Sequence, residues 1–133
     1  MAVVSTETVP VKTEPDVVAV RRRVREVSAL LGFTLVDQTK VVTAASELAR
    51  NTVIHGGGGQ LCLETLNGPR RGLRLTFEDN GPGIPDIELA LRDGFTTGSG
   101  LGLGLGGSKR LVNEFEIFSR PGEGTKVIVT RWK

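Results

Sequence analysis

A tract of alternating glycine and leucine near position 100 constrains this chain more than any other feature. Glycines stand at positions 98, 100, 102, 104, 106 and 107, and leucines stand between them at 101, 103 and 105. So much glycine weakens a regular helix or strand, but it bares backbone N–H groups that can approach an anion closely. A flexible linker is the simple alternative, and leucine at every second position argues against it. The tract therefore indicates a phosphate-binding loop.

Two common phosphate-binding motifs do not fit this tract. The spacing of Gly102, Gly104 and Gly107 matches a dinucleotide-binding fingerprint, but residues 94–99 before it form a polar loop where that motif requires a buried strand. The order Ser108-Lys109 also breaks the Walker A pattern, in which lysine precedes serine or threonine. Both motifs are excluded by their context.

Composition excludes several classes of protein. The 133 residues suit one domain, and 17 basic against 15 acidic residues give a net charge of +2, which predicts no nucleic-acid partner. One cysteine and one histidine offer neither an internal disulfide nor a Cys/His metal cluster. No run approaches the roughly 20 apolar residues of a membrane span, and no signal peptide is evident. These features predict a soluble, cytoplasmic protein without a membrane partner.

The first half of the chain predicts two helices after a loose terminus at 1–7 and a short edge strand at 8–12. The first helix begins near residue 14 and ends before Gly32, and the second runs from an N-cap at Asp37 to about residue 55. Helical spacing gives the second helix a buried stripe of Val41, Ala45, Leu48 and Thr52. A separate row, about 100° around the helix, consists of Glu47, Asn51 and His55. Two side chains one turn apart in that row can address the same ligand.

The second half predicts two hairpins and two short helices. Alternating segments at 60–66 and 72–77 flank a turn at 67–71, and a second hairpin joins 116–120 to 125–132. Short helices are predicted at 87–92 and 107–115. Helices and hairpins alternate without βαβ order, so we expect an α+β sandwich with a mainly antiparallel or mixed sheet.

Three separated features now stand together: Glu47 with Asn51, the acidic turn 78–86 (EDNGPGIPD) and the glycine tract. They resemble the N, G1 and G2 boxes of the GHKL ATPase superfamily. The segments 46–51 (SELARN), 93–97 (DGFTT) and 109–115 (KRLVNEF) are most similar to anti-sigma-factor serine/threonine kinases of the RsbT type, the stressosome switch kinases. The glycine–leucine tract itself is closer to a histidine kinase G2 box. The resemblance covers residues 8–133, as a single domain.

This resemblance implies a Bergerat-type two-layer fold that binds ATP and Mg²⁺ between its helices and its sheet. By resemblance, Glu47 is the general base for the attacking hydroxyl, and the amide oxygen of Asn51 is a Mg²⁺ ligand. Asp79 corresponds to the aspartate that binds the adenine amino group.

The remaining carried-over residues are glycines and one threonine. Gly81 and Gly83 would let the backbone approach the base, and Thr125 stands where the family has a threonine near the adenine aspartate. Three glycines, Gly100, Gly102 and Gly104, would place N–H groups around the phosphates. Residues 84–99 correspond to a short ATP lid. The roles of His55 and Lys109 stay open.

The resemblance implies a serine/threonine kinase that phosphorylates STAS-domain proteins of a stressosome and then activates a downstream PP2C-type phosphatase. An anti-sigma factor that sequesters a sigma factor uses the same scaffold and is the main alternative. A GHKL ATPase subunit is a third possibility, although such machines carry an appended transducer domain.

Overall fold

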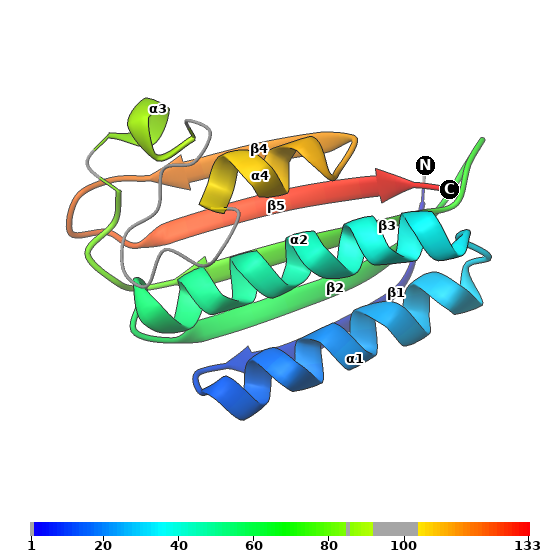
Figure 1. The fold of residues 1–133 in the computed structure, drawn as a ribbon, viewed down its shortest axis with the longest axis horizontal. Helices are drawn as coiled ribbons and strands as arrows, with labels where there is room; N and C mark the ends of the chain where they lie inside the picture. The colour runs from blue at the N-terminus through cyan, green and yellow to red at the C-terminus, as the bar shows by residue number, and fades with distance from the viewer. Residues whose placement is uncertain (1, 85, 92–103) are drawn as a thin grey trace.

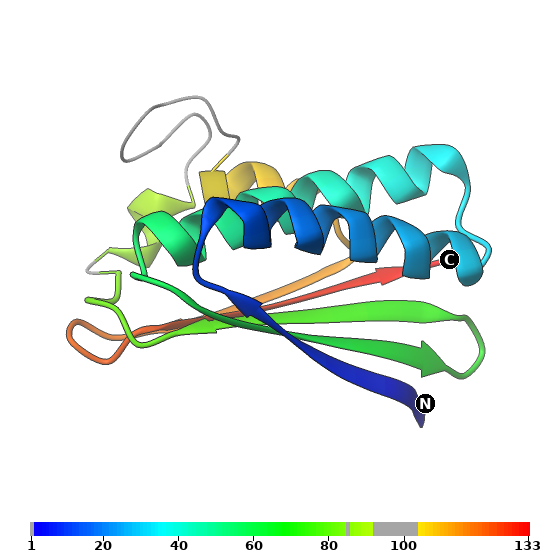
Figure 2. The same ribbon diagram turned by 90° about the horizontal axis from the view of Figure 1, so that it is seen from below.

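The molecule has two layers, with helices on one face of a five-stranded sheet (Figures 1 and 2). A computed structural model describes residues 2–84, 86–91 and 104–133. The strand order is β1-β2-β3-β5-β4, and every pairing among these strands is antiparallel, which confirms the predicted α+β sandwich. The elements in chain order are β1 (Ala2–Val11), α1 (Glu14–Leu30), α2 (Leu35–Ile54), β2 (Gly59–Asn67), β3 (Gly72–Asp79), α3 (Ile87–Ala90), α4 (Gly104–Arg110), β4 (Glu114–Ser119) and β5 (Thr125–Trp132).

The first helix starts at a capping box. Thr13 Oγ1 accepts a hydrogen bond from the Asp16 N–H group, and Asp16 Oδ2 accepts one from the Thr13 N–H group at 3.1 Å. These two bonds satisfy backbone donors that a helix start leaves without partners. The capping contact with Thr13 therefore fixes where β1 turns into α1.

The second helix is capped by Thr34, so the prediction of Asp37 as its N-cap is wrong. Thr34 Oγ1 accepts a hydrogen bond from the Asp37 N–H group at 3.1 Å, so the capping residue is the threonine three positions before Asp37. Asp37 Oδ1 instead accepts a hydrogen bond from Arg131 Nη2 of β5 at 2.7 Å. That bond holds the pKa of the Asp37 carboxyl below its usual value. The pair fastens the start of α2 to the sheet.

Two other predicted boundaries are wrong. The terminus at 2–7 is part of β1 and is not loose, since its valines and threonines favour a strand; a register irregularity between Val3 and Ser5 hides the alternation in the sequence. The helix predicted at 107–115 is α4, which ends at Arg110, and β4 begins at Glu114. Phe115 and Ile117 then alternate toward the core as strand residues.

The core lies between the helices and the sheet. The predicted stripe of α2 is buried at all its positions, against the inward-facing residues of the central strands. The central strands contribute Leu61, Leu63, Leu73, Leu75 and Phe77. Within the residues that the structure describes, none of the helices has the length and apolar character to cross a membrane.

Candidate active site

The C-terminal half of α2 carries a buried carboxylate next to a half-buried amide. Glu47 is only 9% exposed, and it is the sole charged residue among the buried side chains of the described ranges. Arg50 Nη1 lies 3.5 Å from Glu47 Oε1. Asn51 follows one turn after Glu47 and is half-buried. The row predicted from helical spacing thus includes a charge that a purely structural helix would leave in water.

The end of α2 is tied to the glycine run that follows it. The main-chain oxygen of Asn51 accepts hydrogen bonds from His55 N–H at 2.9 Å and Gly56 N–H at 3.1 Å. His55 forms the C-cap of α2, and its side chain is exposed. Gly56 then passes directly beside the carboxyl group of Asp79 at the end of β3. Asn51 and Asp79, far apart in the sequence, are therefore connected through one glycine.

The acidic turn after β3 is shaped by Asp79 itself. Asp79 Oδ1 accepts a hydrogen bond from Gly81 N–H at 2.9 Å, which closes a local turn. Gly81 packs against the backbone of Gly56, where a β-carbon would come 2.7 Å from Gly56 Cα. Gly83 has a φ of 79° and packs against the main-chain oxygen of Arg120. Larger residues would displace this turn, so its glycines are required by packing.

Thr125 lies opposite Asp79 in the register of β3 and β5, so the structure brings these two predicted residues together. Thr125 Oγ1 is 2.8 Å from Ser119 Oγ, which donates to the main-chain oxygen of Gly124 at 3.0 Å. Ser119 Oγ also accepts the Ile84 N–H group at 2.8 Å. Ser119 therefore joins the β4–β5 turn to Ile84 in the acidic turn.

Sequence reasoning missed three residues of this site. The sequence predicts only that the second helix ends near residue 55, just before Gly56, although a run of four glycines directly after the Glu47/Asn51 helix is a signal for close backbone approach. Ser119 gives no local signal, because its partners are distant in sequence. Arg50 is an ordinary i,i+3 neighbour of Glu47 until the burial of that carboxylate is known.

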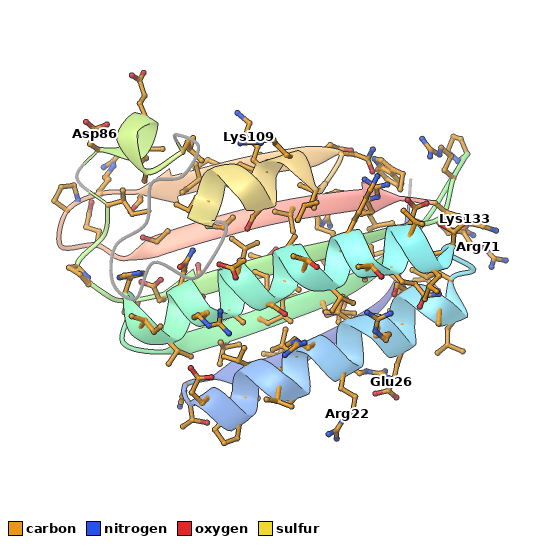
Figure 3. The ribbon with its side chains drawn as sticks, in the orientation of Figure 1. Arg22, Glu26, Arg71, Asp86, Lys109 and Lys133 are labelled. Atoms are coloured by element: carbon orange, nitrogen blue, oxygen red, sulfur yellow. The ribbon has the colours of Figure 1, made fainter. Side chains whose placement is uncertain are left out.

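The phosphate-binding tract is only partly described. Gly100 and Gly102 lie outside the described residues, as does most of the predicted lid at 84–99. Gly104 is the first residue of α4, which packs beside α2 (Figure 1). The Lys109 side chain points away from α2 (Figure 3). The structure therefore places one of the three tract glycines next to the helix that bears Glu47 and Asn51.

The donor set determines which cation the site could hold. The described ranges contain no group of three or more His, Cys, Asp or Glu side chains arranged to hold a metal ion. A Mg²⁺ ion that reaches the protein with nucleotide phosphates needs few protein oxygens and keeps several waters. One amide oxygen on a half-buried asparagine fits that kind of site.

Comparison with known proteins identifies the family. Residues 36–133 match the family described as histidine kinase-, DNA gyrase B- and HSP90-like ATPases. The chain belongs to this family. The resemblance based on the three boxes is confirmed, and so is the predicted ATP-dependent type of domain.

Two relatives place the chain within the family. It is 47% identical over 125 residues to the serine/threonine-protein kinase RsbT of Bacillus subtilis (strain 168), covering 93% of this chain and 94% of that protein. It is 34% identical over 110 residues to the anti-sigma F factor of Thermoanaerobacter sp. (strain X514), covering 79% of this chain and 77% of the relative. The predicted enzyme class, a serine/threonine-protein kinase, is confirmed by the first relationship.

Solved structures confirm the fold independently. The structure of the RsbU and RsbW domains of a Mycobacterium tuberculosis protein has a TM-score of 0.65 at 23% identity, covering 96% of this chain and 32% of that one. The mycobacterial sensor histidine kinase MprB has a TM-score of 0.56 at 19% identity, covering 96% of this chain and 97% of that one. These likenesses support the two-layer arrangement seen in Figure 2.

Proposed function

We propose that this chain binds ATP with Mg²⁺ between α2 and the ends of β3 and β5, and transfers the γ-phosphoryl group to a hydroxyl of a STAS-domain protein. The observation that carries the proposal is the buried Glu47 one turn before Asn51, on a helix whose end lies against Asp79. In this proposal Glu47, Asn51 and Asp79 would act as the base, the Mg²⁺ ligand and the adenine-binding acid of one site.

Each residue has a role that its surroundings support. Glu47 would accept the proton of the attacking hydroxyl, since phosphoryl transfer otherwise needs mainly positioning and charge stabilisation. Asn51 Oδ1 would hold Mg²⁺, which when bound neutralises charge on the phosphates. Asp79 would accept a hydrogen bond from the adenine amino group, with Thr125 beside it on β5. Gly81 and Gly83 would keep this turn close to Gly56 and Arg120, with the backbone of the turn beside the base.

The glycine tract completes the proposed site. The backbone N–H groups of Gly100, Gly102 and Gly104 would bind the phosphates, because glycine lets the main chain approach an anion without a side chain in between. This part rests on the sequence pattern and on the position of Gly104 at the start of α4.

The relatives suggest the partners. RsbT and anti-sigma factor relatives support a place in a cytoplasmic partner-switching system, in which the kinase phosphorylates STAS-domain proteins of a stressosome. In that scheme the kinase would leave the stressosome after phosphorylating it and would then activate a downstream PP2C-type phosphatase. We favour this scheme over other uses of the fold because the 47% identity to RsbT extends over 94% of that protein.

A transfer assay tests the proposal. Purified protein is incubated with γ-labelled ATP, Mg²⁺ and a STAS-domain protein, alongside Glu47→Gln. Label should enter a serine or threonine of the partner with wild type, and Glu47→Gln should lower the rate by about 10²- to 10⁴-fold. The proposal is overturned if the wild-type protein transfers label to none of the STAS-domain proteins encoded in the same genome.

A sigma-factor partner is the second candidate, favoured by the 34% identity to an anti-sigma F factor. Pull-down of purified sigma factors with this chain, in the presence of ATP and Mg²⁺, separates the two functions. Stable binding of a sigma factor without phosphoryl transfer to STAS-domain proteins would support this second function and contradict the first.

A further inference from the structure

Arg50 is the ion-pair partner of Glu47, which is the only buried charged residue in the described part of the chain. Its Nη1 atom lies 3.5 Å from Glu47 Oε1, and the two residues are one helical turn apart. The Arg50 side chain is 36% exposed, while that of Glu47 is 12% exposed. The pair thus joins a carboxylate inside the site to a guanidinium at its rim.

A pair that served only to stabilise the helix would not need this burial. Exposed i,i+3 pairs contribute little to helix stability, and both partners can then remain in water. A buried carboxylate needs a partner, and the attraction to a nearby cation is stronger where water is excluded. The pair of Arg131 with Asp37 is also largely buried, at 15% and 26% exposure, but it joins α2 to β5. The Glu47–Arg50 pair lies within one helix and next to Asn51, so it makes no such connection between elements.

The contact also constrains the direction of the carboxylate. Free glutamate side chains rotate about three bonds, and an arginine anchored one turn later on the same helix restricts that rotation. One oxygen suffices for the ion pair, so the other can accept a proton. General-base catalysis depends on such orientation, since the base must lie within hydrogen-bond reach of the hydroxyl.

We propose that Arg50 is a positioning residue that orients the Glu47 carboxylate toward the acceptor hydroxyl. This inference rests on the proposed function of Glu47 as the base. Arg50 acts on turnover through Glu47, and nucleotide affinity does not depend on it.

Kinetics of four single variants and one double variant test this inference. Arg50→Met removes the charge, Arg50→Lys keeps it, and Arg22→Met is the matched control, since the Arg22 side chain on α1 points into solvent (Figure 3). Glu47→Gln is measured alone and combined with Arg50→Met. The rate of phosphoryl transfer is followed with ATP and with the STAS-domain partner varied separately.

We expect Arg50→Met to lower kcat by about 10- to 100-fold at a temperature where both proteins are folded, with the dissociation constant for ATP close to wild type. Arg50→Lys should recover most of kcat, and Arg22→Met should leave it unchanged. In the Glu47→Gln background, Arg50→Met should change kcat less than about twofold, because coupled residues do not act additively.

Several outcomes overturn the inference. A kcat of Arg50→Met within about twofold of wild type contradicts it directly. A loss of kcat that is accompanied by an equally large weakening of ATP binding also contradicts it. A loss of kcat that persists fully in the Glu47→Gln background contradicts it as well. An inactive wild-type protein would instead contradict the proposed function, so the two failures are distinguishable.

Discussion

Gly56 lies so close to Asp79 that a β-carbon added to the glycine would stand 2.7 Å from Asp79 Cβ and closer still to the carboxyl group. The glycine follows the helix that bears Glu47 and Asn51, and the aspartate ends the central strand β3. This contact sets the spacing between the proposed catalytic helix and the proposed adenine-binding acid. No residue with a side chain fits at position 56 without moving one of them.

Substitution of Gly56 by alanine should therefore damage nucleotide binding. The added methyl group must push the Asp79 side chain or the end of α2 aside, and overpacking of this kind costs about 1–3 kcal/mol. We expect Gly56→Ala to raise the dissociation constant for ATP by more than about tenfold, measured by calorimetric titration.

Gly57→Ala is the control for this prediction. Gly57 has a φ of 73°, but within the described residues no atom beyond its chain neighbours lies within 4 Å of the place that its β-carbon would take, so alanine there brings backbone strain and no clash. It should lower the free energy of unfolding by about 1 kcal/mol and leave ATP affinity unchanged. Equal effects of the two substitutions on ATP affinity would refute the role of the Gly56–Asp79 contact.

Ser119 should support the turn next to the site. Ser119→Ala removes the acceptor of the Ile84 N–H group and the donor to the oxygen of Gly124. Loss of a partly buried hydroxyl with such partners costs about 1–2 kcal/mol of unfolding free energy, measured by chemical denaturation. A faster amide hydrogen exchange at Ile84 should accompany it; unchanged exchange at Ile84 would contradict the bond.

Asp37 should make stability depend on pH in the acid range. Its pKa in the folded protein is lowered, chiefly by the hydrogen bond from Arg131, below the ordinary value of 3.8. A lowered folded-state pKa means that the stabilisation is complete above the unfolded-state pKa and is lost as pH falls through the folded-state pKa. Asp37→Asn should therefore be less stable than wild type near pH 6, with the difference shrinking below about pH 4.

Denaturation at a series of pH values checks this prediction. Glu116→Gln is a suitable control, since Glu116 is an exposed residue of β4. The Asp37–Arg131 linkage is contradicted if wild type and Asp37→Asn differ in unfolding free energy by the same amount from about pH 6 to about pH 2.5.

Much of this fold follows from local patterns in the sequence. The buried stripe of α2 and both hairpins were predictable, because helical and strand periodicities place apolar residues on one face. The N-cap of α2 was misplaced because Thr34 and Asp37 are both good capping residues, and only tertiary contact with Arg131 distinguishes them. The length of β1 was hidden by an irregular register that shifts the alternation.

The candidate site was also predictable only where local sequence motifs mark its residues. Glu47, Asn51 and Asp79 carry recognisable motifs, whereas Gly56 and Ser119 act through partners that only the folded chain brings near. The burial of Glu47 also depends on packing of α2 against the sheet and α4. Roles that depend on long-range contact were therefore the ones that sequence reasoning missed.

Titration of ATP in the presence of Mg²⁺, with wild type, Asp79→Asn and Glu78→Gln, tests the central claim most directly. Glu78 precedes Asp79 on β3 and is exposed, so its variant controls for a general change of charge. The account predicts that wild type binds ATP, that Glu78→Gln binds it equally, and that Asp79→Asn binds it about 10- to 100-fold more weakly through loss of a charge-assisted hydrogen bond to adenine. Equal ATP affinity of Asp79→Asn and wild type would contradict the account.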